Sequence, residues 1–181
     1  PLSSGPAHDV SPTFSPDGQR IYFVRARWHG HHSPFVASGW RDMDLYAVNA
    51  DGSNLTPVTD RWYYQMSRPS VSPDGKQILV RAISPSALTD EEALAAIREE
   101  RKEDRDSLWL IPLDNPDAVH PIRPNLENYA ADPAEKPWAT EPLKYDLYDL
   151  QFSPDGRSTF FTWAGHYQGY FGYEIYLMDL E

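Results

Sequence analysis

Apolar positions along the chain follow a pattern that occurs three times. Each copy opens on the turn sequence Ser-Pro-Asp-Gly, and the third to fifth residues after the glycine are aliphatic, aromatic or β-branched. Because neighbouring residues of a strand point to opposite faces, apolar residues at consecutive positions predict a strand covered on both faces. These strands are centred on residues 21–23, 78–80 and 159–161. The turns are Ser15, Pro16, Asp17 and Gly18; Ser72, Pro73, Asp74 and Gly75; and Ser153, Pro154, Asp155 and Gly156.

A second apolar strand follows downstream in each copy, with the sequences DLYAV at 44–48, SLWLI at 107–111 and EIYLM at 174–178. After the first two, turn-forming residues lead into short segments that contain proline, TPVT at 56–59 and HPIR at 120–123. Proline cannot donate a main-chain hydrogen bond and is therefore confined to sheet edges. Each copy thus predicts a four-stranded antiparallel meander with the proline-containing strand at its outer edge.

Repeated four-stranded units are typical of β-propeller blades. One Ser-Pro-Asp-Gly sequence is only a common hairpin turn, but three copies followed by the same Tyr or Trp strand favour a repeat. We predict an all-β chain of about three blades, at 9–59, 67–123 and 145–181, the last without its fourth strand. A proline-rich connection spans 124–144, and a short inserted helix is predicted over 89–106 because Thr89 and Glu92 form a capping box.

Three blades are fewer than the roughly four to eight with which propellers close, so an incomplete ring is expected. Three alternatives follow: a fragment of a longer propeller, two copies that complete a six-bladed ring, and an open half-propeller that is stable alone. The exposed end faces of an open ring would favour self-association.

The composition of the chain argues against several classes of partner and site. The formal net charge is −11, which argues against nucleic acid as a partner because binding phosphates requires clustered Lys and Arg. The chain has no cysteine, which excludes disulfides and thiolate metal sites. No run of about 18 apolar residues predicts a membrane span, and the first residues lack the pattern of a signal peptide.

The first copy, SPTFSPDGQRIYFV at 11–24 with DMDLYAVNADGSNLTPVT at 42–59, resembles the TolB-type propeller repeat. The resemblance extends over 68–123, apart from an insertion, and over 145–180, where Thr159 replaces the usual aliphatic residue. It implies an exported protein of the periplasm or cell envelope. The same repeat occurs in envelope scaffolds, in propellers of prolyl-oligopeptidase-like hydrolases and in oligogalacturonate lyases, so it leaves the function open.

The long connections of the predicted meanders lie on the face opposite to the Ser-Pro-Asp-Gly turns. These connections are 25–43, 60–67, 83–106, 124–144 and 163–173. Long loops on a rigid scaffold commonly carry binding sites, and their aromatic residues can stack on a sugar or anchor a protein. The aromatic candidates are Trp28, Trp40, Trp62, Tyr63, Tyr64, Tyr167, Tyr170 and Phe171.

Histidines on the same face suggest a divalent metal site, since imidazole is a ligand for Zn, Mn or Ni. Their spacing matches no structural zinc pattern, and ordinary surface histidines are the alternative. No other cofactor is predicted. The candidate ligands are His29, His31, His32 and His166, together with His8.

No nucleophile elbow, zinc-protease motif or phosphate-binding loop occurs in the sequence, so no catalysis is expected within this chain. The leading hypothesis is a non-catalytic propeller segment that binds a protein or carbohydrate through its long-loop face. One alternative is the gating propeller of a prolyl-oligopeptidase-like hydrolase whose catalytic domain lies outside the chain. Another is a lyase that uses histidine-bound metal.

Overall fold

The structure is a computed structural model that describes residues 2–3, 7–26, 43–61, 63–85, 107–122, 146–167 and 170–180. Its strands are antiparallel throughout and form three successive blades, which confirms the predicted all-β fold. The first blade contains β1 (His8–Phe14), β2 (Arg20–Ala26), β3 (Met43–Asn49) and β4 (Thr56–Pro57). The second contains β5 (Tyr63–Met66), β6 (Ser70–Val71), β7 (Gln77–Pro85), β8 (Ser107–Pro112), the 3-10 turn η3 (Pro116–Ala118) and β9 (His120–Ile122). The third contains β10 (Asp146–Phe152), β11 (Ser158–Tyr167) and β12 (Tyr170–Asp179).

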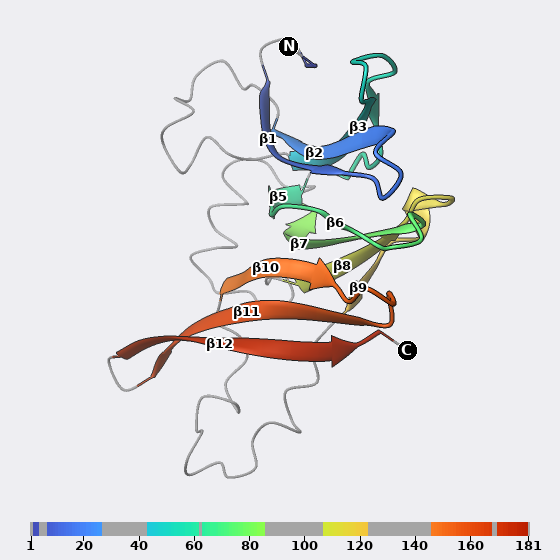
Figure 1. Ribbon diagram of the computed structural model, residues 1–181. Helices are drawn as coiled ribbons and strands as arrows, with labels where there is room; N and C mark the ends of the chain where they lie inside the picture. Colours follow the sequence, from blue (N-terminus) through green and yellow to red (C-terminus); the bar gives the residue numbers. More distant parts are fainter. Residues whose placement is uncertain are drawn as a thin grey trace.

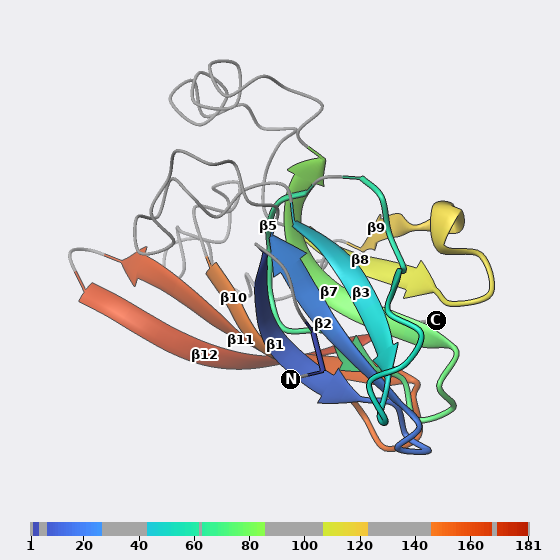
Figure 2. The ribbon, with the colours of Figure 1, turned by 90° about the horizontal axis from the view of Figure 1, so that it is seen from above.

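The blades are stacked one on the next, with the Ser-Pro-Asp-Gly turns along one side of the stack (Figure 1). Seen along the stack, β1, β5 and β10 lie close together on the inner side, and the third blade extends away from the first two (Figure 2). β6 contacts both β1 and β10. The first strands of the three blades therefore line a common inner side.

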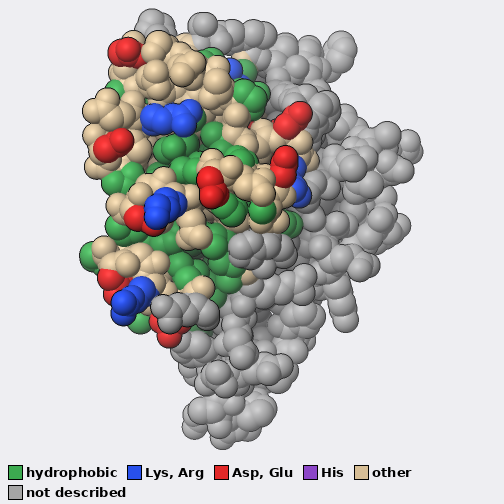
Figure 3. Space-filling view, turned by 90° about the vertical axis from the view of Figure 1, so that its right-hand side faces the viewer, with side chains coloured by type: hydrophobic (Ala, Val, Ile, Leu, Met, Phe, Trp, Pro, Cys, Tyr) green, Lys and Arg blue, Asp and Glu red, His purple; other side chains and the backbone are tan. Residues whose placement is uncertain are grey.

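Each Ser-Pro-Asp-Gly turn is held by the same hydrogen bonds. In the first, the Gly18 amide donates to the Ser15 carbonyl at 2.9 Å, and the Arg20 amide donates to the Ser15 hydroxyl at the same distance. The Ser15 hydroxyl donates to the Asp17 carboxylate at 2.5 Å, and the equivalent distances in the other turns are 2.7 and 2.5 Å. Gly18 has a φ of 68°, a left-handed conformation that favours glycine. Figure 3 views the side of the stack that carries these turns, where charged groups alternate with hydrophobic bands.

The first strand of every blade contains a one-residue bulge. In the first blade Val10 pairs with Val24 but Thr13 pairs with Tyr22, so one extra residue lies on β1. The register of β10 against β11 shifts by the same amount, and so does the register between β5 and β6 on β7. Ser11 and Asp149 occupy the bulges of the first and third blades with φ of 56° and 55°. Bulges redirect side chains, which matters for the site below.

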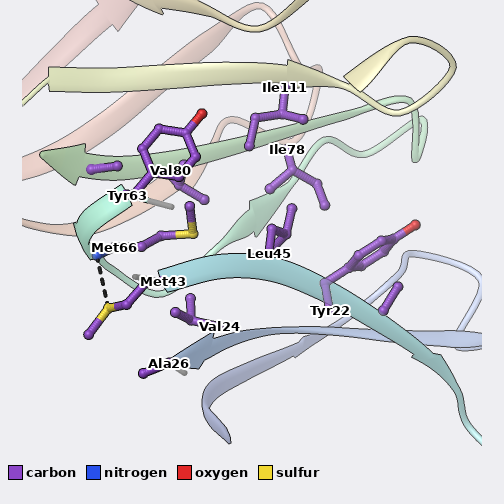
Figure 4. Packing of buried hydrophobic residues seen from close by; sticks show 12 residues of the cluster. Tyr22, Val24, Ala26, Met43, Leu45, Tyr63, Met66, Ile78, Val80 and Ile111 are labelled. Carbon is purple, nitrogen blue, oxygen red and sulfur yellow. Dashed lines mark hydrogen bonds between the residues drawn. The ribbon is translucent and has the colours of Figure 1, made fainter. Parts of the chain in front are cut away.

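Two hydrophobic clusters hold the blades together. The first lies between the first two blades and includes Val24, Leu45, Ile78 and Val80, all fully buried (Figure 4). The second joins the second and third blades through Leu79, Leu108 and Phe161, among others. Ile78, Leu79 and Val80 are consecutive residues of β7 and are fully buried, which confirms that this strand of the second blade is covered on both faces.

Two predicted loops are strands instead. Within 60–67, residues Tyr63–Met66 form β5, which pairs with β7 and through Tyr63 with Met43 of the first blade. Within 163–173, β11 and β12 continue as one long hairpin in which Gly165 pairs with Gly172. Glycine is depleted in strands, so the two glycines weaken the local strand signal at this point of the sequence. The predicted helix over 89–106 and the connection over 124–144 lie outside the described residues.

Candidate functional site

A groove of about 510 Å³ runs along the inner side of the three blades. β1 contributes Thr13 and Phe14 to its lining, and β10 contributes residues 149–152. Residues 67–71, which connect β5 to β6 and include β6, line the middle. The groove therefore draws on all three blades.

The bulges place charged residues in this groove. Arg68 lies between β5 and β6, four residues before Ser72, and Asp149 lies four residues before Ser153. Both residues are exposed and line the groove. The equivalent residue of the first blade is Ser11, so the bulge position carries different chemistry in each blade. Asp149 also accepts a hydrogen bond from the Thr162 hydroxyl at 3.3 Å.

Strands of adjacent blades hold the groove in shape. The Phe152 amide donates to the Ser70 hydroxyl at 3.2 Å, which joins β10 to β6. Phe14 is 61% exposed at the rim, whereas Phe152 is 9% exposed. The groove thus combines hydroxyl groups, one cation, one anion and an exposed aromatic ring along the first strands of three blades. This set can bind a polar ligand through hydrogen bonds, ion pairs and stacking.

Tyr63 does not lie on an exposed surface. Its side chain is fully buried in the first hydrophobic cluster, where its ring meets that of Trp109 edge-on at 5.7 Å. Burial raises the pKa of Tyr63 to about 12. Within the described part of the chain, its hydroxyl has no hydrogen-bond partner. Tyr63 therefore contributes to the core and offers no surface to a ligand.

The other candidates from the sequence are only partly covered by the structure. The backbones of Tyr64, His166, Tyr167 and Tyr170 belong to β5, β11 and β12, and Tyr167 pairs with Tyr170 where the β11–β12 hairpin turns. Their side chains are outside the described part of the chain, as is that of Phe171. Trp28, His29, His31, His32, Trp40 and Trp62 lie wholly outside it.

The described residues contain no group of three or more His, Asp or Glu side chains that could hold a metal ion. Of the five candidate histidines, only the side chain of His8 is described. The most buried carboxylate, that of Asp44, has a structural role. It accepts hydrogen bonds from the Thr59 hydroxyl at 2.8 Å and the Arg61 amide at 2.9 Å, which ties the end of the first blade to β3.

Sequence reasoning did not find the groove. A shared pattern does precede each Ser-Pro-Asp-Gly turn in the sequence. The four residues before the turn end on an apolar residue but begin on a different polar one in each blade: SPTF at 11–14, RPSV at 68–71 and DLQF at 149–152. Without the register of the neighbouring strand, however, the bulges next to the groove residues Arg68 and Asp149 cannot be recognised.

No family model and no curated protein matches the sequence. No helix among the described residues is long and apolar enough to cross a membrane. Solved structures, in contrast, match nearly the whole chain. TolB from Acinetobacter baumannii is similar with a TM-score of 0.57 at 17% identity, over 99% of this chain and 31% of that one.

An oligogalacturonate lyase in complex with manganese is similar with a TM-score of 0.54 at 16% identity, over 98% of this chain and 36% of the lyase. A prolyl endopeptidase is similar with a TM-score of 0.54 at 13% identity, over 98% of this chain and 21% of that protein. The chain thus spans about a third or less of the length of these proteins. Similarity at such identities shows the fold alone, and that fold is the β-propeller.

Proposed function

We propose that this chain is a non-catalytic propeller segment that binds a protein or glycan ligand, with the inner groove as part of the binding surface. The observation that supports this most directly is the placement of Arg68 and Asp149 by two bulges in one groove. Bulges are over-represented next to functional sites, and a non-glycine residue in a left-handed conformation costs free energy that the surrounding structure must offset. Asp149 accepts this conformation beside the groove.

The loop-face residues Trp28 and Trp40 belong to the same proposal, because the sequence places them between two strands of the first blade. β2 ends at Ala26 and β3 begins at Met43, and these two residues pair. Ala26 and Met43, the described residues on either side of 27–42, therefore lie at the end of the blade opposite to the Ser-Pro-Asp-Gly turns. An exported location, which the TolB-type resemblance implies, is likewise part of the proposal.

Binding to glycan and peptide arrays tests the proposal, because both ligand classes are then offered as probes. Arg68→Ala and Asp149→Asn are the groove variants, and Asn tolerates the left-handed conformation of Asp149. Lys76→Ala is the matched control, since the Lys76 side chain is 80% exposed at the turn end. For each glycan or peptide that the wild-type chain binds, we expect each groove variant to weaken the affinity by about tenfold or more. The control variant should bind like wild type.

Trp28→Ala and Trp40→Ala form the second arm of the same experiment. Loss of binding in this arm alone would assign the ligand to the loop face and remove the groove from the site. If the wild-type chain binds no glycan and no peptide on the arrays, the result would contradict the proposed binding role.

The similarity to a manganese-bound lyase leaves an enzyme as the specific alternative. Metal analysis of untagged protein separates the two functions, because a histidine-bound metal would be present in stoichiometric amount. Such a result would favour a metal-dependent lyase. A hydrolase domain in the same polypeptide would favour the gating propeller of a prolyl-oligopeptidase-like enzyme.

A further inference from the structure

The chain contains four Asp-Gly pairs, and Asp-Gly is the dipeptide in which an aspartate isomerises most readily. The main-chain nitrogen of the glycine attacks the side-chain carboxyl carbon of the aspartate, and water is expelled as a succinimide ring closes. Glycine favours this step because it has no side chain to obstruct the attack and is conformationally free. The pairs are Asp17–Gly18, Asp51–Gly52, Asp74–Gly75 and Asp155–Gly156.

The folded turns occupy both reacting groups with hydrogen bonds. In the Asp51 turn, the Gly52 amide donates to the Asn49 carbonyl at 2.8 Å. The Asp51 carboxylate accepts from the Ser53 amide at 2.8 Å and from the Ser53 hydroxyl at 2.6 Å. These bonds from Ser53 also lower the pKa of Asp51, so its carboxyl group is ionised at neutral pH and is a poor electrophile. The Ser-Pro-Asp-Gly turns contain the equivalent bonds, so isomerisation at any of the four pairs requires the turn to open first.

The serine that holds the aspartate is itself held differently in the two kinds of turn. In the Ser-Pro-Asp-Gly turns, the serine hydroxyl accepts the main-chain amide of the first residue of the next strand, at 2.9, 2.9 and 3.0 Å. The Ser53 hydroxyl instead accepts from the side-chain amide of Asn49 at 2.9 Å, a contact between exposed side chains. Exposed side chains change rotamer within nanoseconds, whereas a main-chain amide in a strand is fixed. The hydroxyl that restrains Asp51 is therefore the less firmly held.

The residue before the aspartate also differs. It is proline in every Ser-Pro-Asp-Gly turn, but it is Ala50 in the turn that contains Asp51. Proline fixes its own φ and thereby reduces the number of conformations that an opened turn can adopt. Opening the Asp51 turn therefore gains more conformational entropy than opening one of the other three.

The strand that follows each turn shows the largest contrast. After the Ser-Pro-Asp-Gly turns, the second residue of the next strand is Ile21, Ile78 or Thr159, and these are 8%, 0% and 0% exposed. The Asp51 turn leads instead to β4, whose two residues are both exposed and which pairs with β3. Local opening is least costly where few buried contacts break. The Asp51 turn can thus open without displacing a buried strand.

We propose that Asp51 is a site of spontaneous isoaspartate formation in the folded protein, whereas the three Ser-Pro-Asp-Gly turns protect their aspartates. When the turn opens, the Gly52 nitrogen bonds to the side-chain carboxyl carbon of Asp51 and gives its proton to solvent, and a carboxyl oxygen leaves as water. Water then opens the ring. Attack at the main-chain carbonyl yields isoaspartate, and attack at the side-chain carbonyl restores aspartate, so no reactant other than water is needed.

Isoaspartate formation would alter the outer edge of the first blade. The main chain then runs through the former side chain of Asp51 and is one carbon longer, and the carboxylate is attached directly to Cα. The hydrogen bonds of the carboxylate to Ser53 and of the Gly52 amide to the Asn49 carbonyl cannot both form in this geometry. The connection between β3 and β4 is therefore the part of the blade that the modification disturbs.

Incubation of the full chain in water enriched in heavy oxygen tests the proposal, because every succinimide that hydrolyses takes up a labelled oxygen whichever carbonyl is attacked. Peptide mapping by mass spectrometry locates the label, and retention time separates isoaspartate from aspartate. In the native chain we expect label at Asp51 at least about tenfold faster than at the other three aspartates, a ratio that one or two hydrogen bonds in the free energy of opening produce. In urea, where all four turns are open, the four rates should become similar.

Three results would overturn the proposal. The first is equal labelling of the four pairs in the native chain, or faster labelling at a Ser-Pro-Asp-Gly turn. The second is the same ratio of rates in urea as in the native chain, because the difference would then lie in the local sequence and not in the fold. The third is a native chain that gains no label at Asp51 while the chain in urea does.

Variants of one Ser-Pro-Asp-Gly turn test the physical reason for the protection. Ser15→Ala removes the hydroxyl that accepts the Arg20 amide and donates to Asp17, so labelling at Asp17 should rise by several-fold toward that at Asp51. Ser15→Thr keeps the hydroxyl and is the matched control. Asp51→Glu would require a larger ring that closes far more slowly, so it should remove the label at this position and verify its assignment. An unchanged rate at Asp17 in a Ser15→Ala chain that keeps its circular dichroism spectrum would refute the protective role of the serine.

Discussion

Leu108 and Ile175 occupy the same position of the repeat, and we predict that their truncation to alanine has very different costs. Leu108 is fully buried between the second and third blades, where it packs with Leu79 and Phe161. Removing a buried leucine side chain costs roughly 2 to 5 kcal/mol, because apolar contact is lost and a cavity remains. Ile175 is 79% exposed, so only about a fifth of that contact is present to lose, and its truncation should cost less than about 1 kcal/mol.

Urea unfolding measures both values, with the free energy of unfolding extrapolated to water. The measurement belongs at a concentration where the chain sediments as a monomer, so that any self-association does not alter the exposure of Ile175. Leu110→Ala and Leu177→Ala provide a matched second pair, 6% and 62% exposed. Equal losses at Leu108 and Ile175 in the monomer would refute the reasoning, because the repeat position and not the burial would then set the cost.

Three further predictions concern single residues. Tyr63→Phe removes a buried hydroxyl that lacks a partner among the described residues, so it should leave the free energy of unfolding unchanged or raise it by up to about 1 kcal/mol in urea unfolding; a clear loss would reveal a hidden partner. Gly156→Ala should cost about 1 to 2 kcal/mol in the same assay because φ is 73°, and a neutral effect would show that the turn adapts. Burial alone would raise the pKa of Asp9, but hydrogen bonds from Arg25 and Ser3 hold it below its ordinary value of 3.8. Asp9 therefore stabilises the fold above that pH and loses its contribution as pH falls through the folded-state pKa, so the melting temperatures of wild type and Asp9→Asn should converge in acid; a constant difference would mean that the charge of Asp9 is irrelevant.

The strands that sequence reasoning predicted are those with strong local signals. The residues around Ile21 and Ile78 follow a turn that glycine and proline specify, and they are β-branched or aromatic in succession. The edge strands β4 and β9 were marked by Pro57 and Pro121, which pair only on one side. In each case the information lies within a few residues, so no knowledge of the neighbouring strand is needed.

Pairing between distant segments decided what the sequence did not predict. β5 and the far end of the β11–β12 hairpin are strands because partners are available to them, even though Gly165 and Gly172 weaken the local preference. Tyr63 looked like a surface aromatic beside other aromatics, but its position on β5 turns it into the core against Trp109.

The number of blades, their turns and their apolar strands were determined by the sequence alone, because turn chemistry and alternation of side chains act over a few residues. The inner groove, with Arg68 and Asp149 in it, was decided by tertiary structure, because a bulge exists only relative to the register of a partner strand. The same holds for burial. Leu108 and Ile175 are interchangeable in the pattern, and only the presence or absence of a following blade in the described structure makes one core and the other surface.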